Sequence, residues 1–106
     1  MNKVEIYGRL VRDVEQVKSK SGIDVGRFTL AVPRKGNKEE TDFIDCISFG
    51  KLTETLIKYT EKGNRLLVTG SINIRDYEDK DKNKKRSFYI VVDDFYFVDY
   101  KKELTK

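Results

Sequence analysis

Hydrophobic and polar residues alternate along much of this chain, with the two-residue period of β-strands. The alternation predicts a first strand over residues 4–10 and a second strand around residues 28–32. Ser21-Gly22 marks a turn between them. Pro33 ends the second strand, and the charged segment 34–41 is expected to be a hairpin loop.

One helical segment interrupts the strands. Residues 42–49 predict a third strand, and Leu52, Leu56 and Tyr59 recur at the spacing of a helix over residues 51–62. Gly63 stands where a helix C-terminus favours positive φ. The fourth strand is expected to turn five residues inward: Leu66, Val68, Gly70, Ile72 and Ile74. The fifth, residues 88–100, is almost continuously apolar, which fits a strand covered on both faces, for example by a second subunit.

Three strands, a short helix and two more strands are the element order of the OB-fold. The predicted fold is therefore all-β: a five-stranded OB-fold barrel with one short α-helix between the third and fourth strands. A chain of 106 residues holds one such domain. We expect the barrel over residues 1–100 and a short polar extension over residues 101–106.

The composition argues against enzymatic chemistry. There is no histidine, which removes the usual general base and the commonest metal ligand. The single cysteine, Cys46, lies in an apolar run and is expected to be a small buried hydrophobe. Asp93 and Asp94 are adjacent on a strand and should point to opposite faces unless a bulge intervenes. We therefore expect no catalytic residue, no metal site and no cofactor.

Charge and targeting signals bear on partner and location. Lysine and arginine number 22 against 18 acidic residues, a net charge of +4 that favours a polyanionic partner only weakly. No apolar signal region or membrane-length segment is apparent. A cytoplasmic protein is expected.

Several aromatic residues are candidates for base stacking. Tyr77 shares the parity of Asn73 and Arg75, so it is expected to face solvent beside a basic segment, as a stacking platform or as an ordinary surface tyrosine. Phe43 and Phe49 share the more apolar face of the third strand, and the pattern alone favours the core for both. The remaining aromatics expected to pack inside are Phe28, Tyr59, Phe88, Phe95 and Phe97.

An ordered set of short motifs extends from the first residue to about Val98. They are Met1-Asn2-Lys3-Val4, Gly8-Arg9-Leu10, Phe28-Thr29-Leu30-Ala31-Val32, Asp42-Phe43-Ile44-Asp45-Cys46-Ile47-Ser48-Phe49-Gly50-Lys51, Lys62-Gly63, Val68-Thr69-Gly70-Ser71-Ile72 and Arg75-Asp76-Tyr77. In its order and spacing the set resembles the bacterial single-stranded DNA-binding protein family. The resemblance implies an OB barrel that assembles, usually as a homotetramer, and holds single-stranded DNA in the cytoplasm, at the nucleoid.

The resemblance also implies which residues touch DNA. Its stacking aromatics fall on Phe43, Phe49 and Tyr77, which places the two phenylalanines in the groove and leaves Ile44 and Cys46 inward. The cations implied as phosphate contacts are Lys3, Arg9, Arg12, Arg34, Lys35, Arg75, Lys84, Lys85 and Arg86. The implied function is sequence-nonspecific binding and protection of single-stranded DNA in replication, recombination or repair.

The chain departs from the family in three ways. It has no tryptophan, which the family commonly uses for stacking. Glu5 stands at a usually apolar subunit contact, so a dimer is possible as well as a tetramer. The acidic tail that recruits replication and repair proteins is missing, so such recruitment is not expected. Two alternatives stay open: a primosomal-type interaction module that binds DNA as a dimer in replication restart, and an RNA-binding OB module.

Overall fold

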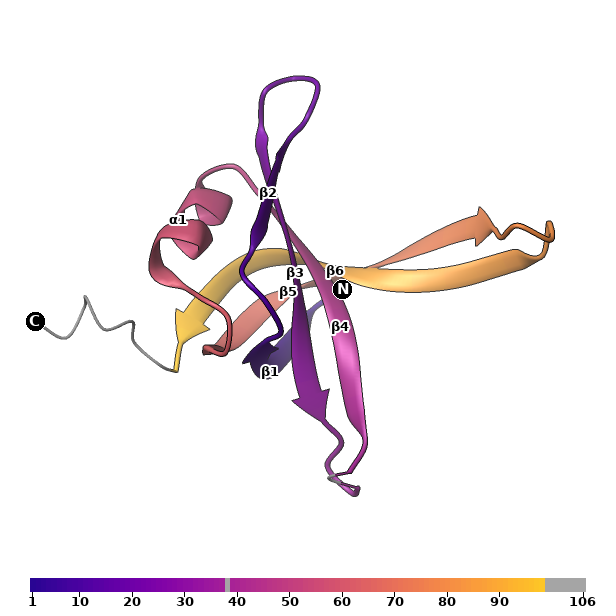
Figure 1. The fold of residues 1–106 in the computed structure, drawn as a ribbon, viewed down its shortest axis with the longest axis horizontal. Coiled ribbons are helices and arrows are strands. Elements are labelled where there is room, and N and C mark those ends of the chain that lie inside the picture. Colours follow the sequence, from indigo (N-terminus) through magenta and orange to yellow (C-terminus); the bar gives the residue numbers. More distant parts are fainter. Residues whose placement is uncertain (38, 99–106) are drawn as a thin grey trace, which may run out of the picture.

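The computed structural model describes residues 1–37 and 39–98. Its elements, in chain order, are β1 (Val4–Leu10), β2 (Glu15–Lys18), β3 (Asp24–Pro33), β4 (Thr41–Phe49), α1 (Lys51–Tyr59), β5 (Arg65–Glu78) and β6 (Lys84–Phe97). Figure 1 shows a small central barrel from which three hairpin ends project in different directions. They are the β2–β3 turn, the β3–β4 loop and the long β5–β6 hairpin.

The strands close into a barrel, which confirms the OB-fold prediction. Their order is β1-β5-β6-β4-β3-β2, and β1 also pairs with β3, so the ring closes. The closing contacts join Arg9 to Ala31 and Leu10 to Leu30. β4 and β6 pair in parallel, with Cys46 opposite Ile90 and all other pairings antiparallel among the described strands. The helix lies between β4 and β5, which are the predicted third and fourth strands.

The strand β2 was not predicted. All four of its residues are exposed, so it has no buried face to produce an alternating pattern. Backbone pairing with β3 alone defines it, from Glu15 opposite Arg27 to Lys18 opposite Asp24. Together β1 and β2 act as one interrupted first strand, because β1 pairs with β5 and β2 continues along β3.

The core fills the barrel with one or two side chains from most strands. Leu10, Leu30, Leu66 and Ile90 are fully buried, and Leu56 of α1 packs into the same cluster. The helix is shorter than the predicted 51–62, because Thr60 adopts an extended conformation and its backbone N–H closes the last turn on Leu56 O. Gly63 does have the expected positive φ, in the loop after the helix.

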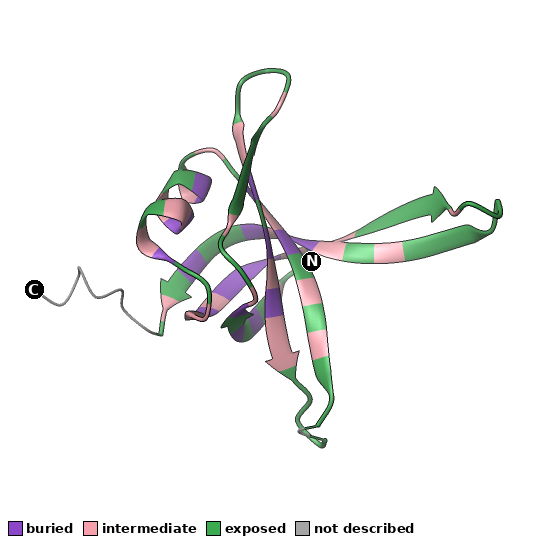
Figure 2. Ribbon diagram, in the orientation of Figure 1, coloured by how far each residue is buried: buried purple, intermediate pink, exposed green. Residues whose placement is uncertain are grey.

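The prediction was wrong for the outer half of the β5–β6 hairpin. Ile72, Ile74 and Phe88 were expected inside, but they are 40%, 59% and 48% exposed. Ile74 lies directly opposite Phe88, on a hairpin whose outer part extends past the barrel (Figures 1 and 2), and neither side chain belongs to the buried core. Elements of this chain therefore do not cover both faces of the apolar run from residue 88, and the end of that run and the extension 101–106 lie outside the described residues.

Candidate nucleic-acid interface

The three aromatics implied by the family resemblance share one continuous outer face of the sheet. Phe43 and Phe49 lie on the same face of β4 as Ile47, at four and two residues from it. Ile47 pairs with Val91 of β6. Near the start of β6, Lys85 lies on the same face, opposite Tyr77 of β5. Because paired residues point to the same side of a sheet, the register carries the face from β4 to the hairpin.

All three rings are available to a ligand. Phe43, Phe49 and Tyr77 are 66%, 49% and 46% exposed. The pattern-based expectation that the two phenylalanines lie in the core is therefore wrong. The opposite face of β4 is the buried one: Cys46 and Ser48 point inward, and Ser48 shares a hydrogen bond of 2.7 Å with Thr53 of α1.

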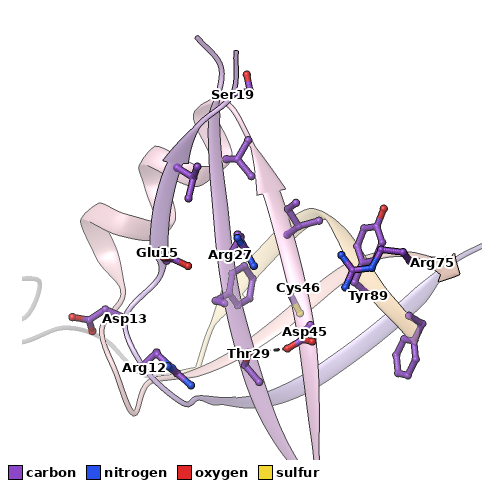
Figure 3. A pocket seen from close by; sticks show the side chains of 15 residues that line it. Arg12, Asp13, Glu15, Ser19, Arg27, Thr29, Asp45, Cys46, Arg75 and Tyr89 are labelled. Carbon is purple, nitrogen blue, oxygen red and sulfur yellow. Dashed lines mark hydrogen bonds between the residues drawn. The ribbon is translucent and has the colours of Figure 1, made fainter. Parts of the chain in front are cut away.

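A groove of ≈ 570 Å³ opens on this face. Its walls come from β2, β3, β4 and the root of the β5–β6 hairpin (Figure 3). Its polar side chains include Arg12, Arg27, Asp45, Arg75 and Tyr89. The stacking candidates do not line this groove but stand around it, along β4 and farther out on the hairpin.

A second, shallow hollow of ≈ 660 Å³ lies along the outer β5–β6 hairpin. Tyr77 lines it together with Lys84, Lys85 and Arg86, and so do the acids Asp76 and Glu78. Lys84 to Arg86 precede the predicted fifth strand, residues 88–100, but in the structure they begin β6 and pair with residues 76–78. The structure thus places one aromatic and three cations of the implied set at one site.

The cations that the resemblance implies as phosphate contacts differ in whether a carboxylate of the protein already binds them. The Arg34 guanidinium donates to both carboxylate oxygens of Asp42, at 3.1–3.2 Å, and lies 3.4 Å from Glu40 Oε2. The hydrogen bond to Asp42 raises the pKa of Arg34 above its ordinary value. Arg86 Nε donates to Asp76 Oδ1 at 2.8 Å. Both cations are already paired with carboxylates.

The other cations of the implied set either have no partner among the described residues or lie away from the two hollows. Within residues 1–37 and 39–98, the side chains of Arg12 and Arg75 form no hydrogen bond or ion pair, and both line the groove. Arg9 Nη1 donates to the Gly63 carbonyl at 2.7 Å, on the barrel wall, and Lys3 precedes β1. Neither lines a described hollow, and Lys35 stands at the β3–β4 loop.

Sequence reasoning missed several groove residues. Arg27 and Thr29 occupy the polar positions of β3 that alternate with Phe28 and Leu30. That alternation shows that they face outward, but not that they face a hollow. Tyr89 was hidden inside an apolar run, although it lies opposite Asn73 on the groove face. The groove residues come from elements far apart in the chain, so spacing carried no signal.

Known proteins resemble this chain over nearly the whole described length. The single-strand binding protein family matches residues 1–98. A single-stranded DNA-binding protein of Clostridium perfringens is 46% identical over 100 residues, which cover 93% of this chain and 67% of the relative. The chain belongs to the single-strand binding protein family.

Two further relatives show how much of a family member is present. Single-stranded DNA-binding protein 3 of Clostridium acetobutylicum is 38% identical over 104 residues, covering 94% of this chain and 72% of that protein. A single-stranded DNA-binding protein of Fusobacterium nucleatum is 37% identical over 100 residues, covering 89% and 64%. This member of the single-strand binding protein family therefore spans about two thirds of the length of these relatives.

Family membership confirms the resemblance seen in the sequence and separates the chain from enzymes.

Asp93 is the extra residue of a β-bulge, because Thr69 pairs with Asp94 while Gly70 pairs with Val92. In the part of the chain that the structure describes, no three His, Cys, Asp or Glu side chains gather as metal ligands. The helix α1 is too short and too polar to cross a membrane.

The single cysteine is a structural residue. Cys46 is 3% exposed, and burial raises the pKa of its thiol to about 12. A thiol that remains protonated near neutral pH is a poor nucleophile. Its position on the inner face of β4, opposite Phe28 of β3 and Ile90 of β6, assigns it to the core.

Proposed function

We propose that this chain binds single-stranded DNA without a strict sequence requirement, by stacking bases on Phe43, Phe49 and Tyr77 while neighbouring cations contact the phosphates. The observation that supports this proposal best is the set of three exposed rings on one sheet face around a groove lined by unpaired arginines. OB-folds bind oligonucleotides on this face, between the first and last hairpins. Every base has a π-face, so stacking tolerates any sequence.

The spacing of the rings requires an extended ligand. Phe43 and Phe49 are six residues apart on one strand, which corresponds to about 20 Å. One base cannot contact both, so a strand must follow β4 and then pass the groove toward Tyr77 on the hairpin. Arg12 and Arg75, lining the groove, and Lys85, beside Tyr77, then lie within the path of the phosphates. The other implied cations, at Lys3, Arg9, Arg34, Lys35, Lys84 and Arg86, extend that path or stabilise the protein itself.

The biological setting follows from the ligand. We propose that the chain covers and protects single strands exposed in replication, recombination or repair, in the cytoplasm at the nucleoid. We further propose a homo-oligomer, with four copies as in the family resemblance or two copies if Glu5 weakens the contact of β1. Glu5 is exposed on β1, and the described structure pairs the Val4–Gly8 part of this strand only with β5. Light scattering decides between the two states.

Titration of labelled oligo-dT, oligo-U and a DNA duplex of equal length tests the proposed ligand. We expect oligo-dT to bind more tightly than the duplex, and its affinity to fall as salt rises from 50 to 200 mM, as phosphate contacts require. Tighter binding of the duplex, or affinity independent of salt, would reject the proposal. Stronger binding of oligo-U would favour an RNA-binding module.

Alanine substitutions test the stacking residues. Phe43→Ala, Phe49→Ala and Tyr77→Ala should each weaken oligo-dT binding by about 5- to 150-fold, the equivalent of ~1–3 kcal/mol per stacked base. Tyr96→Ala is the matched control, because Tyr96 is 52% exposed but lines neither hollow. Thermal melting should show all four variants folded. An equal loss from Tyr96→Ala would show that the three rings have no special role.

A further inference from the structure

Asp45 is one of three acids that line the groove, with Asp13 and Glu15, and it is the one carried by β4, the strand of the two stacking phenylalanines. It lies on the groove face of β4, two residues from Phe43, which is about 7 Å along the strand. Its side chain is exposed and lines the groove, where Arg12, Arg27 and Arg75 approach from other elements (Figure 3). If the groove served only to attract phosphates, the negative charge of Asp45 in its lining would oppose that attraction.

The contacts of Asp45 hold it in place without neutralising it. Thr29 lies directly opposite on β3, and its hydroxyl donates to Asp45 Oδ1 at 3.0 Å. Arg27 is the diagonal neighbour, opposite Ile47, yet the described residues contain no ion pair between Arg27 and Asp45. The carboxylate is thus held by one hydroxyl, and no other side chain of the described residues donates a hydrogen bond to it.

An ionised carboxylate only accepts hydrogen bonds, so its partner on DNA must be a base rather than a phosphate. Bases in single strands expose their pairing edges to protein side chains. Guanine carries an N–H and an amino group side by side on that edge, which suits the two oxygens of a carboxylate. Thymine offers one N–H between two carbonyl oxygens, which face the same carboxylate unfavourably.

We infer that Asp45 reads bases and gives the groove a preference for guanine over thymine, superimposed on sequence-tolerant stacking. This inference rests on the proposed function, since a base must first reach the groove face. A base stacked on Phe43 turns its edge along β4, within reach of the carboxylate two residues away. Thr29 is the positioning residue, because its hydroxyl fixes the orientation of Asp45.

The test compares an oligonucleotide of alternating dT and dG with oligo-dT of equal length, bound by the full chain. The wild-type chain should prefer the guanine-containing strand. In Asp45→Asn this preference should fall by about fivefold or more, the discrimination expected for one well-formed carboxylate contact to a base. The asparagine keeps the size of the side chain and still accepts from Thr29. Thr29→Val should reduce the preference part-way, because it removes the hydroxyl that orients Asp45.

Two outcomes overturn the inference. Either Asp45→Asn leaves the preference unchanged, or it raises affinity for both strands by the same factor, which means that Asp45 only repels the DNA backbone. Failure of the proposed function gives a different result, because wild-type protein would then bind a duplex as tightly as either single strand. Because Asp45 is exposed, Asp45→Asn should melt at the wild-type temperature, and Thr29→Val, at a half-buried position, provides an independent reading if Asp45→Asn misfolds.

Discussion

The arginines of the implied DNA-binding set should contribute unequally to the salt dependence of binding. Arg75 lines the groove and, among the described residues, has no carboxylate partner. Arg34 already donates to Asp42 through two of its nitrogens and lies close to Glu40. A phosphate that approaches Arg75 displaces only counterions, whereas one that approaches Arg34 must compete with two carboxylates.

The expected size of the difference follows from counterion release. Each phosphate contact on a single strand adds about 0.7 to the slope of log affinity against log salt. Arg75→Ala should lower the slope by that amount, so the loss of oligo-dT affinity between 50 and 200 mM salt becomes about 2.6-fold smaller than in wild type. The double variant Arg34→Gln/Asp42→Asn removes one cation and one anion, and its slope should stay within error of the wild-type value.

The measurement is a fluorescence titration of oligo-dT at four or more salt concentrations for the three proteins, with melting curves to confirm folding. Two results refute the reasoning. A slope for Arg75→Ala equal to wild type means that Arg75 touches no phosphate. A slope for the double variant that falls by about 0.7 means that Arg34 leaves Asp42 to bind DNA.

Three further predictions concern the barrel itself. Phe28→Ala should lower the free energy of unfolding by about 3–5 kcal/mol in urea titration, because this ring is 5% exposed in the core; a change below about 1 kcal/mol contradicts that placement. Gly70→Ala should yield no folded barrel by circular dichroism, because an added Cβ would lie 2.1 Å from the Val91 carbonyl oxygen. A cooperative melt of this variant at the wild-type temperature would contradict the prediction. A thiol reagent at pH 8 should label Cys46 in native protein at a rate about a hundredfold lower than in urea, because the thiol is buried and its pKa is raised to about 12. Equal labelling rates would show that the thiol is accessible in the folded barrel.

The sequence predicted the elements that alternate in burial. The strand over residues 4–10 was recognised because Ile6 and Leu10 alternate with Glu5 and Arg9, and in the structure the first two are buried and the last two are exposed. Alternation also located β4, and the spacing of apolar residues at a helical period located α1. Element order then led to the OB-fold. In contrast, β2 is exposed on both faces, so only its backbone pairing with β3 reveals it.

The sequence alone did not decide which face of a strand meets the core. Phe43 and Phe49 made the outer face of β4 look apolar, and the family resemblance, later matched by their exposure, reversed that interpretation. Ile74 and Phe88 looked internal, but the hairpin that carries them extends past the barrel, so both side chains stay about half exposed.

Periodicity in one strand reports that its two faces differ; it carries no information about how far neighbouring elements reach. The chain by itself therefore determined its family, its strands other than β2 and its buried cysteine. Only the closed barrel brought Arg27, Asp45 and Arg75 to one groove, because pairing register and hairpin length, rather than sequence spacing, decide which side chains meet.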